Sequence, residues 1–161
     1  MYMMKQTLIL ALICVALAIV AVAYGDSQYA TALGRPAPPI YARNATDTVS
    51  AASLKGGYTL LNFWSSTNAP SRKAANEYTA WLRNHPESRV RLVSINFDTN
   101  EALFHEIARV DSLEPSQQYH VRGDTARAIR TGYDLKKGYG SLLVDPDGRI
   151  VAHNPKPGDL P

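Results

Sequence analysis

The chain has 161 residues, of which 45% are hydrophobic and 19% are charged, as expected for one globular domain with a substantial core. Its formal net charge is +3 at pH 7, and its basic residues form neither a long run nor a stripe interleaved with aromatic residues. The charge pattern therefore argues against nucleic acid as a partner.

Residues 1–25 predict an export signal or a membrane anchor. Residues 1–7 carry one basic residue, Lys5, and residues 8–24 contain no charged residue and no side-chain amide. A basic start followed by an apolar run is typical of a secretory signal, and Ala21-Val22-Ala23 supplies a small-x-small cleavage site. The run is slightly short for a spanning helix, which needs about 20 residues. A cleaved signal, slightly favoured, and a retained inner-membrane tether both fit, and we expect export to the periplasm.

Cys14, the one cysteine in the chain, lies inside this apolar run. Its neighbours lack the small-residue pattern of a lipidation site. If the signal is cleaved, the mature protein has no cysteine and therefore no disulfide, thiolate nucleophile or thiolate metal site. We expect no cofactor and no metal.

An extended, irregular lead-in is predicted for residues 26–47, because prolines at 36, 38 and 39 remove backbone donors and restrict the chain. The domain proper is assigned to residues 48–161. Its first predicted strand, residues 58–64, is short and mostly apolar and follows a Gly-Gly turn.

The next predicted element is a helix that begins at Thr67 or Asn68, since a capping residue stands there with Pro70 in the first turn. Its apolar face carries Ala74, Tyr78, Trp81 and Leu82. The remaining elements are a strand at 90–97, a helix at 101–110, a short helix at 124–130 capped by Asp124, and a hairpin of strands 141–145 and 149–153 around the turn at 146–148. This order predicts an α/β fold whose mixed sheet has a parallel part and an antiparallel edge.

Three segments resemble the thioredoxin superfamily, and most of all the exported thiol-disulfide oxidoreductases and redoxins of bacteria. They are the lead-in at 34–38, the first strand with its approach at 54–64, and the closing hairpin at 143–150. The resemblance covers residues 33–155 and implies a thioredoxin-like fold with a central mixed sheet flanked by helices.

In that family the first strand runs into a Cys-x-x-Cys motif. The matching stretch here is Asn68-Ala69-Pro70-Ser71, so the resemblance places Asn68 and Ser71 at the positions of the two redox cysteines. Trp64, Pro70 and Arg72 do match the family pattern. An amide cannot attack sulfur, and a hydroxyl is a weak nucleophile without a base beside it. The resemblance therefore implies a degenerate member with no catalytic residue at this site.

Two further departures concern the loop before the hairpin and the C-terminus. Tyr139 stands where the family has a cis-proline, and a cis bond before a non-proline residue is costly, so we expect a trans loop of different shape. The family's final helix is missing, because the chain runs into the proline-rich segment 155–161. Either the sheet face is covered in another way, or apolar surface is exposed, which would favour self-association or a partner.

We predict that the protein is a redox-inactive binding or accessory module, with a protein or an extended peptide as its partner. The candidate binding residues are Trp64, Thr67, Asn68, Pro70, Arg72 and Tyr139, and Trp64 is expected to be partly exposed. A residual enzyme of the thiol-disulfide oxidoreductase or redoxin type, acting without cysteine, remains the alternative. Asp98, Glu101 and His105 suggest a metal site more weakly, since the helix dipole alone accounts for carboxylates at a helix start.

Overall fold

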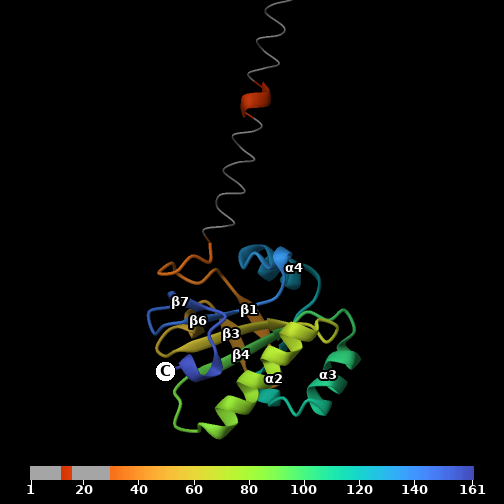
Figure 1. The fold of residues 1–161 in the computed structure, drawn as a ribbon. Helices are drawn as coiled ribbons and strands as arrows, with labels where there is room; N and C mark the ends of the chain where they lie inside the picture. The colour runs from red at the N-terminus through yellow and green to blue at the C-terminus, as the bar shows by residue number, and fades with distance from the viewer. Residues whose placement is uncertain (1–11, 16–29) are drawn as a thin grey trace, which may run out of the picture.

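The computed structural model describes residues 12–15 and 30–161 (Figure 1). The predicted signal or anchor therefore lies outside the described residues, except for the short helical stretch 12–15 in which Cys14 is exposed. No helix within the described ranges combines the length and the apolar character that a membrane crossing needs.

A five-stranded mixed sheet in the order β5-β4-β3-β6-β7 lies at the centre of the domain (Figure 1). Strands β3, β4 and β5 are parallel, and β6 and β7 add an antiparallel hairpin to the other side of β3. The strand bounds are β3 Thr59–Trp64, β4 Arg91–Asn96, β5 Gln118–His120, β6 Ser141–Val144 and β7 Ile150–His153. The predicted fold class is confirmed, although the three-residue strand β5 was not predicted.

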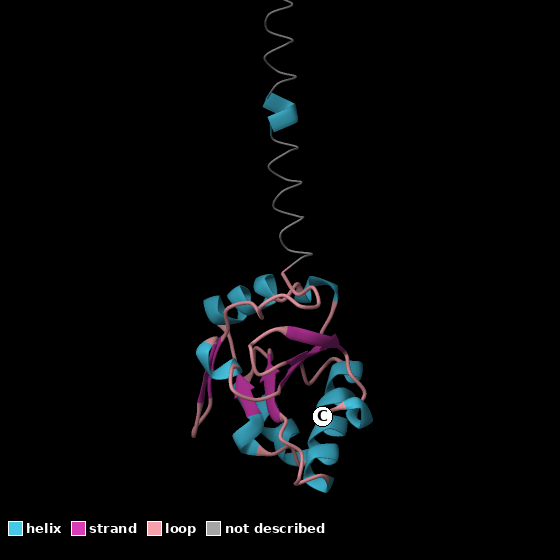
Figure 2. Ribbon diagram, turned by 90° about the vertical axis from the view of Figure 1, so that its left-hand side faces the viewer, coloured by secondary structure: helices cyan, strands magenta, loops and turns pink. Residues whose placement is uncertain are grey.

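Helices cover both faces of the sheet. Helices α2 (Ala69–Asn84) and α3 (Glu101–Val110) lie on one face, and α4 (Gly123–Gly132) lies on the other (Figures 1 and 2). Four short 3-10 helices, η1 to η4, complete the domain at Ala52–Leu54, Pro115–Gln117, Leu135–Lys137 and Pro157–Asp159. The predicted cap of α4 was wrong: Arg122 is the N-cap, without a side-chain hydrogen bond, and Asp124 lies inside the first turn.

The alternation of side chains along the strands divides the core into two layers. Leu61 and Phe63 of β3 pack with Ile129 and Tyr133 on the α4 side. Leu60 of the same strand points the other way and joins the cluster around Tyr78 of α2. Successive side chains of a strand point to opposite faces, so a continuous apolar run such as β3 requires cover on both faces.

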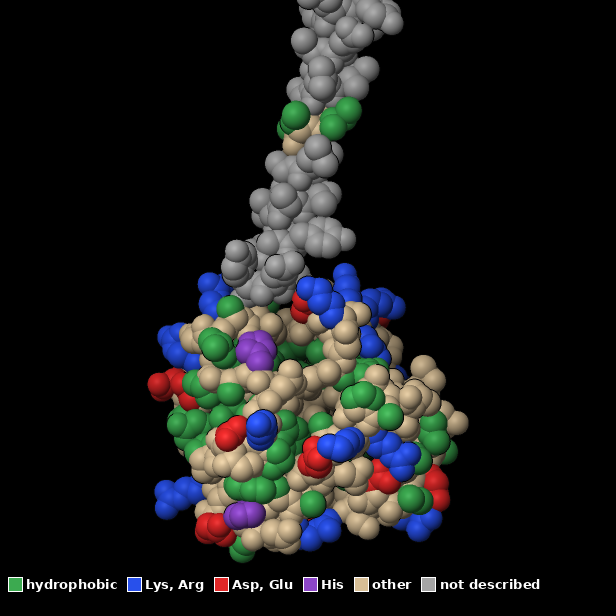
Figure 3. Space-filling model, in the orientation of Figure 1, with side chains coloured by type: hydrophobic (Ala, Val, Ile, Leu, Met, Phe, Trp, Pro, Cys, Tyr) green, Lys and Arg blue, Asp and Glu red, His purple; other side chains and the backbone are tan. Residues whose placement is uncertain are grey.

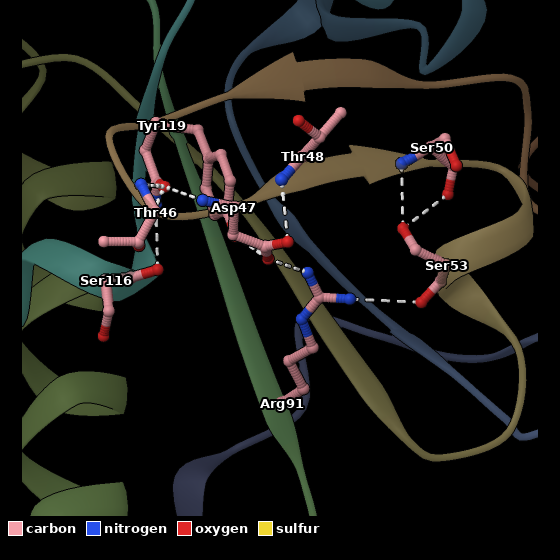
Figure 4. A network of polar contacts seen from close by, with 9 residues as sticks. Thr46, Asp47, Thr48, Ser50, Ser53, Arg91, Ser116 and Tyr119 are labelled. Atoms are coloured by element: carbon pink, nitrogen blue, oxygen red, sulfur yellow. Dashed lines mark hydrogen bonds and ion pairs between the residues drawn. The ribbon is translucent and has the colours of Figure 1, made fainter.

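A two-stranded hairpin, β1 (Tyr41–Arg43) and β2 (Thr48–Ser50), lies in and just beyond the segment predicted to be irregular. Its turn is attached to the sheet by Asp47, whose carboxylate accepts a hydrogen bond of 2.8 Å from Tyr119 Oη and pairs with Arg91 (Figure 4). The bond from Tyr119 lowers the pKa of Asp47. The expectation of irregular structure up to residue 47 was therefore wrong for β1.

The C-terminal tail packs beside α2 without forming an α-helix. Leu160 is buried in the cluster that contains Tyr78, and Tyr78 Oη donates a hydrogen bond of 2.7 Å to the carbonyl of Pro155. Ser88 Oγ also donates to the carbonyl of Pro161 at 3.2 Å. Of the two alternatives for a chain without the final helix, covered or exposed apolar surface, the tail supports cover at this place.

Candidate functional site

The positions that match the redox cysteines form the start of α2, at the carboxyl end of β3. Of the two predicted capping residues, Asn68 is the N-cap: its Oδ1 accepts a hydrogen bond of 3.0 Å from the backbone N–H of Ser71. Ser71 is buried, and its hydroxyl donates to the carbonyl of Asn68 at 3.0 Å and accepts from the N–H of Ser65 at 3.3 Å. Both side chains therefore satisfy backbone groups at the helix start.

The loop between β3 and α2 is held by Asp98, a buried carboxylate just beyond the end of β4. Asp98 accepts hydrogen bonds from Ser65 Oγ at 2.7 Å, from Ser66 N at 2.9 Å and Oγ at 2.5 Å, and from Asn96 Nδ2 at 3.0 Å. Burial opposes ionisation of Asp98, but these donors outweigh it and hold the pKa of the carboxyl below its ordinary value. The loop is therefore fixed by a charged, fully hydrogen-bonded group.

Sequence reasoning considered Asp98 only as a metal ligand and missed this role. The parallel order of β3 and β4 could have predicted it, because the segments that follow two parallel strands meet at the same edge of the sheet. Glu101 and His105, the other two residues of that weak metal hypothesis, are exposed on α3, where Glu101 Oε1 lies 3.9 Å from His105 Nε2, and neither side chain bonds to Asp98. Within residues 12–15 and 30–161, no group of three or more His, Cys, Asp or Glu side chains is arranged to hold a metal ion.

Arg72 in the first turn of α2 forms an ion pair and is not simply solvated. Its Nε and Nη2 atoms both donate to the carboxylate of Asp111 at 2.6 Å, and Asn76 Nδ2 adds a third bond to that carboxylate at 3.0 Å. The bonds from Arg72 lower the pKa of Asp111, although burial opposes them. Such a two-point contact joins α2 to the end of α3 and occupies the guanidinium that we proposed for ligand binding.

Trp64 is fully buried, which corrects the expectation of a partly exposed ring. Its side chain lies on the α3 face of the sheet, where the ring centroid is 6.1 Å from that of Phe104. No acceptor for its indole Nε1–H lies among the residues that the structure describes. Trp64 is therefore a packing residue under α3, and its buried ring is not available for direct contact with a ligand.

Tyr139 is half-buried in the loop before β6. Its hydroxyl accepts a hydrogen bond of 2.6 Å from Arg130, whose guanidinium lies 4.6 Å from the centroid of the Phe97 ring. The predicted trans geometry is confirmed, because the described chain contains no cis peptide bond. Tyr139 lines a cavity of about 390 Å3 together with Tyr133 and His153, and none of the other candidate residues lines it.

The histidines do not supply a base for the serine hydroxyls of this site. His120 is the nearest in the hydrogen-bond network, and its Nε2 contacts the backbone carbonyl of Asp98 at 2.7 Å. A Ser-His-Asp catalytic arrangement needs the imidazole between the hydroxyl and the carboxylate. Here Ser65 and Ser66 donate directly to the carboxylate of Asp98, so their hydroxyls are not activated by an imidazole.

Residues 33–153 match the model of the AhpC/TSA family. The chain belongs to the AhpC/TSA family. A search of curated proteins found no significant match.

Solved structures with the same fold come from several bacteria. A thioredoxin-like protein from Parabacteroides distasonis is 30% identical, with a TM-score of 0.66 over 80% of this chain and 90% of the other. A thiol:disulfide interchange protein from a Bacteroides species is 23% identical, with a TM-score of 0.70 over 81% and 86%. A DsbE-type thiol:disulfide interchange protein from Chlorobium tepidum is 19% identical, with a TM-score of 0.63 over 76% and 84%. The thioredoxin-like fold is therefore shown.

Proposed function

We propose that this AhpC/TSA family member is a redox-inactive binding module of the thioredoxin fold. One observation carries the proposal: Asn68 and Ser71, at the positions of the family's redox cysteines, are both used to build the start of α2. The chain's one cysteine, Cys14, lies outside the matched range 33–153. Thiol-disulfide exchange needs a thiolate that attacks a disulfide sulfur, and neither side chain at this site can supply one.

The alternative, a residual enzyme that acts without cysteine, finds no support in the geometry. The hydroxyls of Ser65, Ser66 and Ser71 all donate to oxygen acceptors. A serine nucleophile requires an adjacent general base that takes its proton, and Asp98 has a lowered pKa that makes it a poor base.

We propose that the protein is exported to the periplasm and that residues 1–25 are a signal or an inner-membrane anchor. It rests on the basic start and the apolar run of the sequence, most of which lies outside the described residues. Within the rest of the chain we propose a lead-in at residues 26–47 and a domain at residues 48–161. The family match begins inside this lead-in, at residue 33.

As partner we propose an extended polypeptide segment that lies across the start of α2 and the loop at Tyr139. Thr67 and Pro70 are exposed there, and Asn68 and Tyr139 are half-buried. Both segments adjoin the same end of β3, because the carbonyl of Gly140 accepts the backbone N–H of Phe63 at 3.0 Å. Charges are interspersed over the face that carries α2 and α3, so no large patch of one sign selects the partner there (Figure 3).

The test of peptide binding compares Tyr139→Ala with Tyr41→Ala, an exposed tyrosine on β1 that serves as the control. Reduced, carboxymethylated casein serves as an extended polypeptide, and its affinity is measured by fluorescence anisotropy. We expect Tyr139→Ala to weaken binding at least tenfold and Tyr41→Ala to leave it unchanged. Equal binding by both variants, or no binding by the unaltered protein, would refute this surface as a peptide site.

A further inference from the structure

A second cavity, of about 620 Å3, lies between α3 and the edge strand β5, and none of the candidate binding residues lines it. One wall is a single face of α3 that carries Glu101, Phe104, His105 and Ala108, spaced three, four and seven residues from the first. The turn between β1 and β2 and the segment that leads into β5 close the opposite side. Its volume suits a ligand of small-molecule or short-peptide size.

A residue that lines this cavity carries a buried, unpaired amide. Gln118 of β5 is 3% exposed and lines the cavity. Neither its Nε2 nor its Oε1 has a hydrogen-bond partner among the described residues. A buried polar group without a partner is costly, and in native structures such a group is usually satisfied by something. Because Gln118 offers a donor and an acceptor side by side, its complement is another amide group.

The rim of the cavity is mainly cationic. Arg43, Arg109 and Arg122 line it, against one lining carboxylate, Glu101. Arg122 lies 3.4 Å from Glu101, and Arg109 is paired with Glu106 at 2.7 Å. Arg43 has no ion pair among the residues described. The excess of guanidinium groups favours an anionic ligand, and a carboxylate matches their fork of donors.

Two aromatic rings of the cavity already stack on each other. Phe104 is buried, and the ring of His120 already stacks on it with centroids 5.2 Å apart and planes inclined by 12°. The face of Phe104 that meets His120 is therefore closed to a planar ligand such as a nucleobase. The cavity thus offers the unpaired amide of Gln118, guanidinium groups at its rim, and apolar contact from Ala108 and Leu113.

We propose that this cavity binds the carboxyl-terminal end of a peptide. The last peptide group pairs with the amide of Gln118, and the terminal carboxylate is held by Arg43 at the rim. This site is separate from the surface of Asn68 and Tyr139, and it does not depend on the function proposed for that surface.

The test uses the full-length, 15N-labelled protein and three probes followed by NMR: N-acetyl-alanyl-alanine, its C-terminal amide, and acetate. The first probe should bind with a roughly millimolar dissociation constant, as expected for so few atoms, and should shift the side-chain amide signals of Gln118. Removing the charge in the amidated probe, or the peptide group in acetate, should weaken binding at least tenfold. Equal binding of the amidated probe, or no shift with the first probe, would overturn the proposal.

Three variants identify the site. Gln118→Leu removes the amide with little change of volume, and it should abolish binding while the melting temperature is unchanged or raised. Arg43→Gln, at an exposed position that does not endanger the fold, should weaken binding at least fivefold. Arg127→Gln on α4 is the matched control, because Arg127 and its ion-pair partner Asp124 both lie outside the cavity. This variant should bind the dipeptide normally. Normal binding by both Gln118→Leu and Arg43→Gln would place the ligand elsewhere and refute the assignment. Tighter binding of a nucleotide, uridine 5′-monophosphate, than of the dipeptide would also refute it.

Discussion

The substitution Asp98→Asn tests how strongly one buried carboxylate fixes the loop before α2. Through one oxygen Asp98 accepts from Ser65 Oγ and Ser66 N, and through the other from Ser66 Oγ and Asn96 Nδ2. An asparagine keeps the shape of the side chain but replaces one acceptor by an NH2 donor. That donor would face Asn96 Nδ2, donor against donor, while the hydroxyl of Ser66 can rotate to accept from it.

The expected loss of stability follows from these four bonds. One buried donor is left without an acceptor, which costs about 1–3 kcal/mol, and the two bonds to the remaining oxygen lose their charge assistance, about 1 kcal/mol each. Relief from burying a charge offsets part of this sum. We therefore expect Asp98→Asn to lower the free energy of unfolding at pH 7 by about 2–3 kcal/mol, measured by urea denaturation.

The pH dependence gives a second, independent readout. The folded pKa of Asp98 is lowered, so the carboxylate stabilises the fold above its unfolded pKa of about 3.9. This contribution is lost as the pH falls through the folded pKa. The difference between the unaltered protein and Asp98→Asn should be constant from about pH 5 to 7 and should shrink below about pH 4.

Asp147→Asn is the matched control, because this exposed carboxylate in the hairpin turn makes no side-chain hydrogen bond or ion pair with the described residues. It should change stability by less than about 0.5 kcal/mol. A loss for Asp98→Asn no larger than that of this control, or a loss that persists undiminished in acid, would refute the view that the charge of Asp98 holds the loop.

Three further changes test neighbouring features by urea denaturation. Asp111→Asn should cost about 1 kcal/mol at pH 7 and less in acid, because it weakens a two-point contact with Arg72 and the folded pKa of Asp111 is lowered; a loss independent of pH would contradict this. Leu160→Ala should cost about 2 kcal/mol, as for a buried side chain, whereas exposed Val151→Ala should cost little; equal losses would show that the tail does not pack. Asn68→Ala should cost about 1 kcal/mol through the lost cap, and Asn68→Asp should restore it; no rescue would count against capping.

The central elements could be predicted because their signals are local. Each signal is contained in a short stretch of sequence: the apolar run of β3, the capping residue before α2, and the turn of the β6–β7 hairpin. The three-residue strands β1 and β5 are too short to show alternation. Strand β1 pairs with its neighbour β2 in a local hairpin, whereas β5 exists because of a partner far along the chain, as in the pairing of Gln118 with Ser94.

The candidate site shows the same division. Asn68 was recognised as a helix start, since its cap bond reaches only three residues ahead. The contact of Asp98 with Ser65 spans 33 residues and that of Arg72 with Asp111 spans 39 residues, so no local sequence pattern could predict them. The burial of Trp64 also depends on a distant element, because α3 places Phe104 over it.

The most direct test of the account measures disulfide reductase activity, with insulin as substrate and dithiothreitol as reductant. Cys14→Ser is compared with the same chain carrying Asn68→Cys and Ser71→Cys, so that the only cysteines present are those introduced at the start of α2. We predict that Cys14→Ser does not exceed the dithiothreitol blank and that the chain with both cysteines does, because the helix start that lowers a thiolate pKa is intact. Activity of Cys14→Ser above the blank would contradict the claim that this fold has lost its redox chemistry.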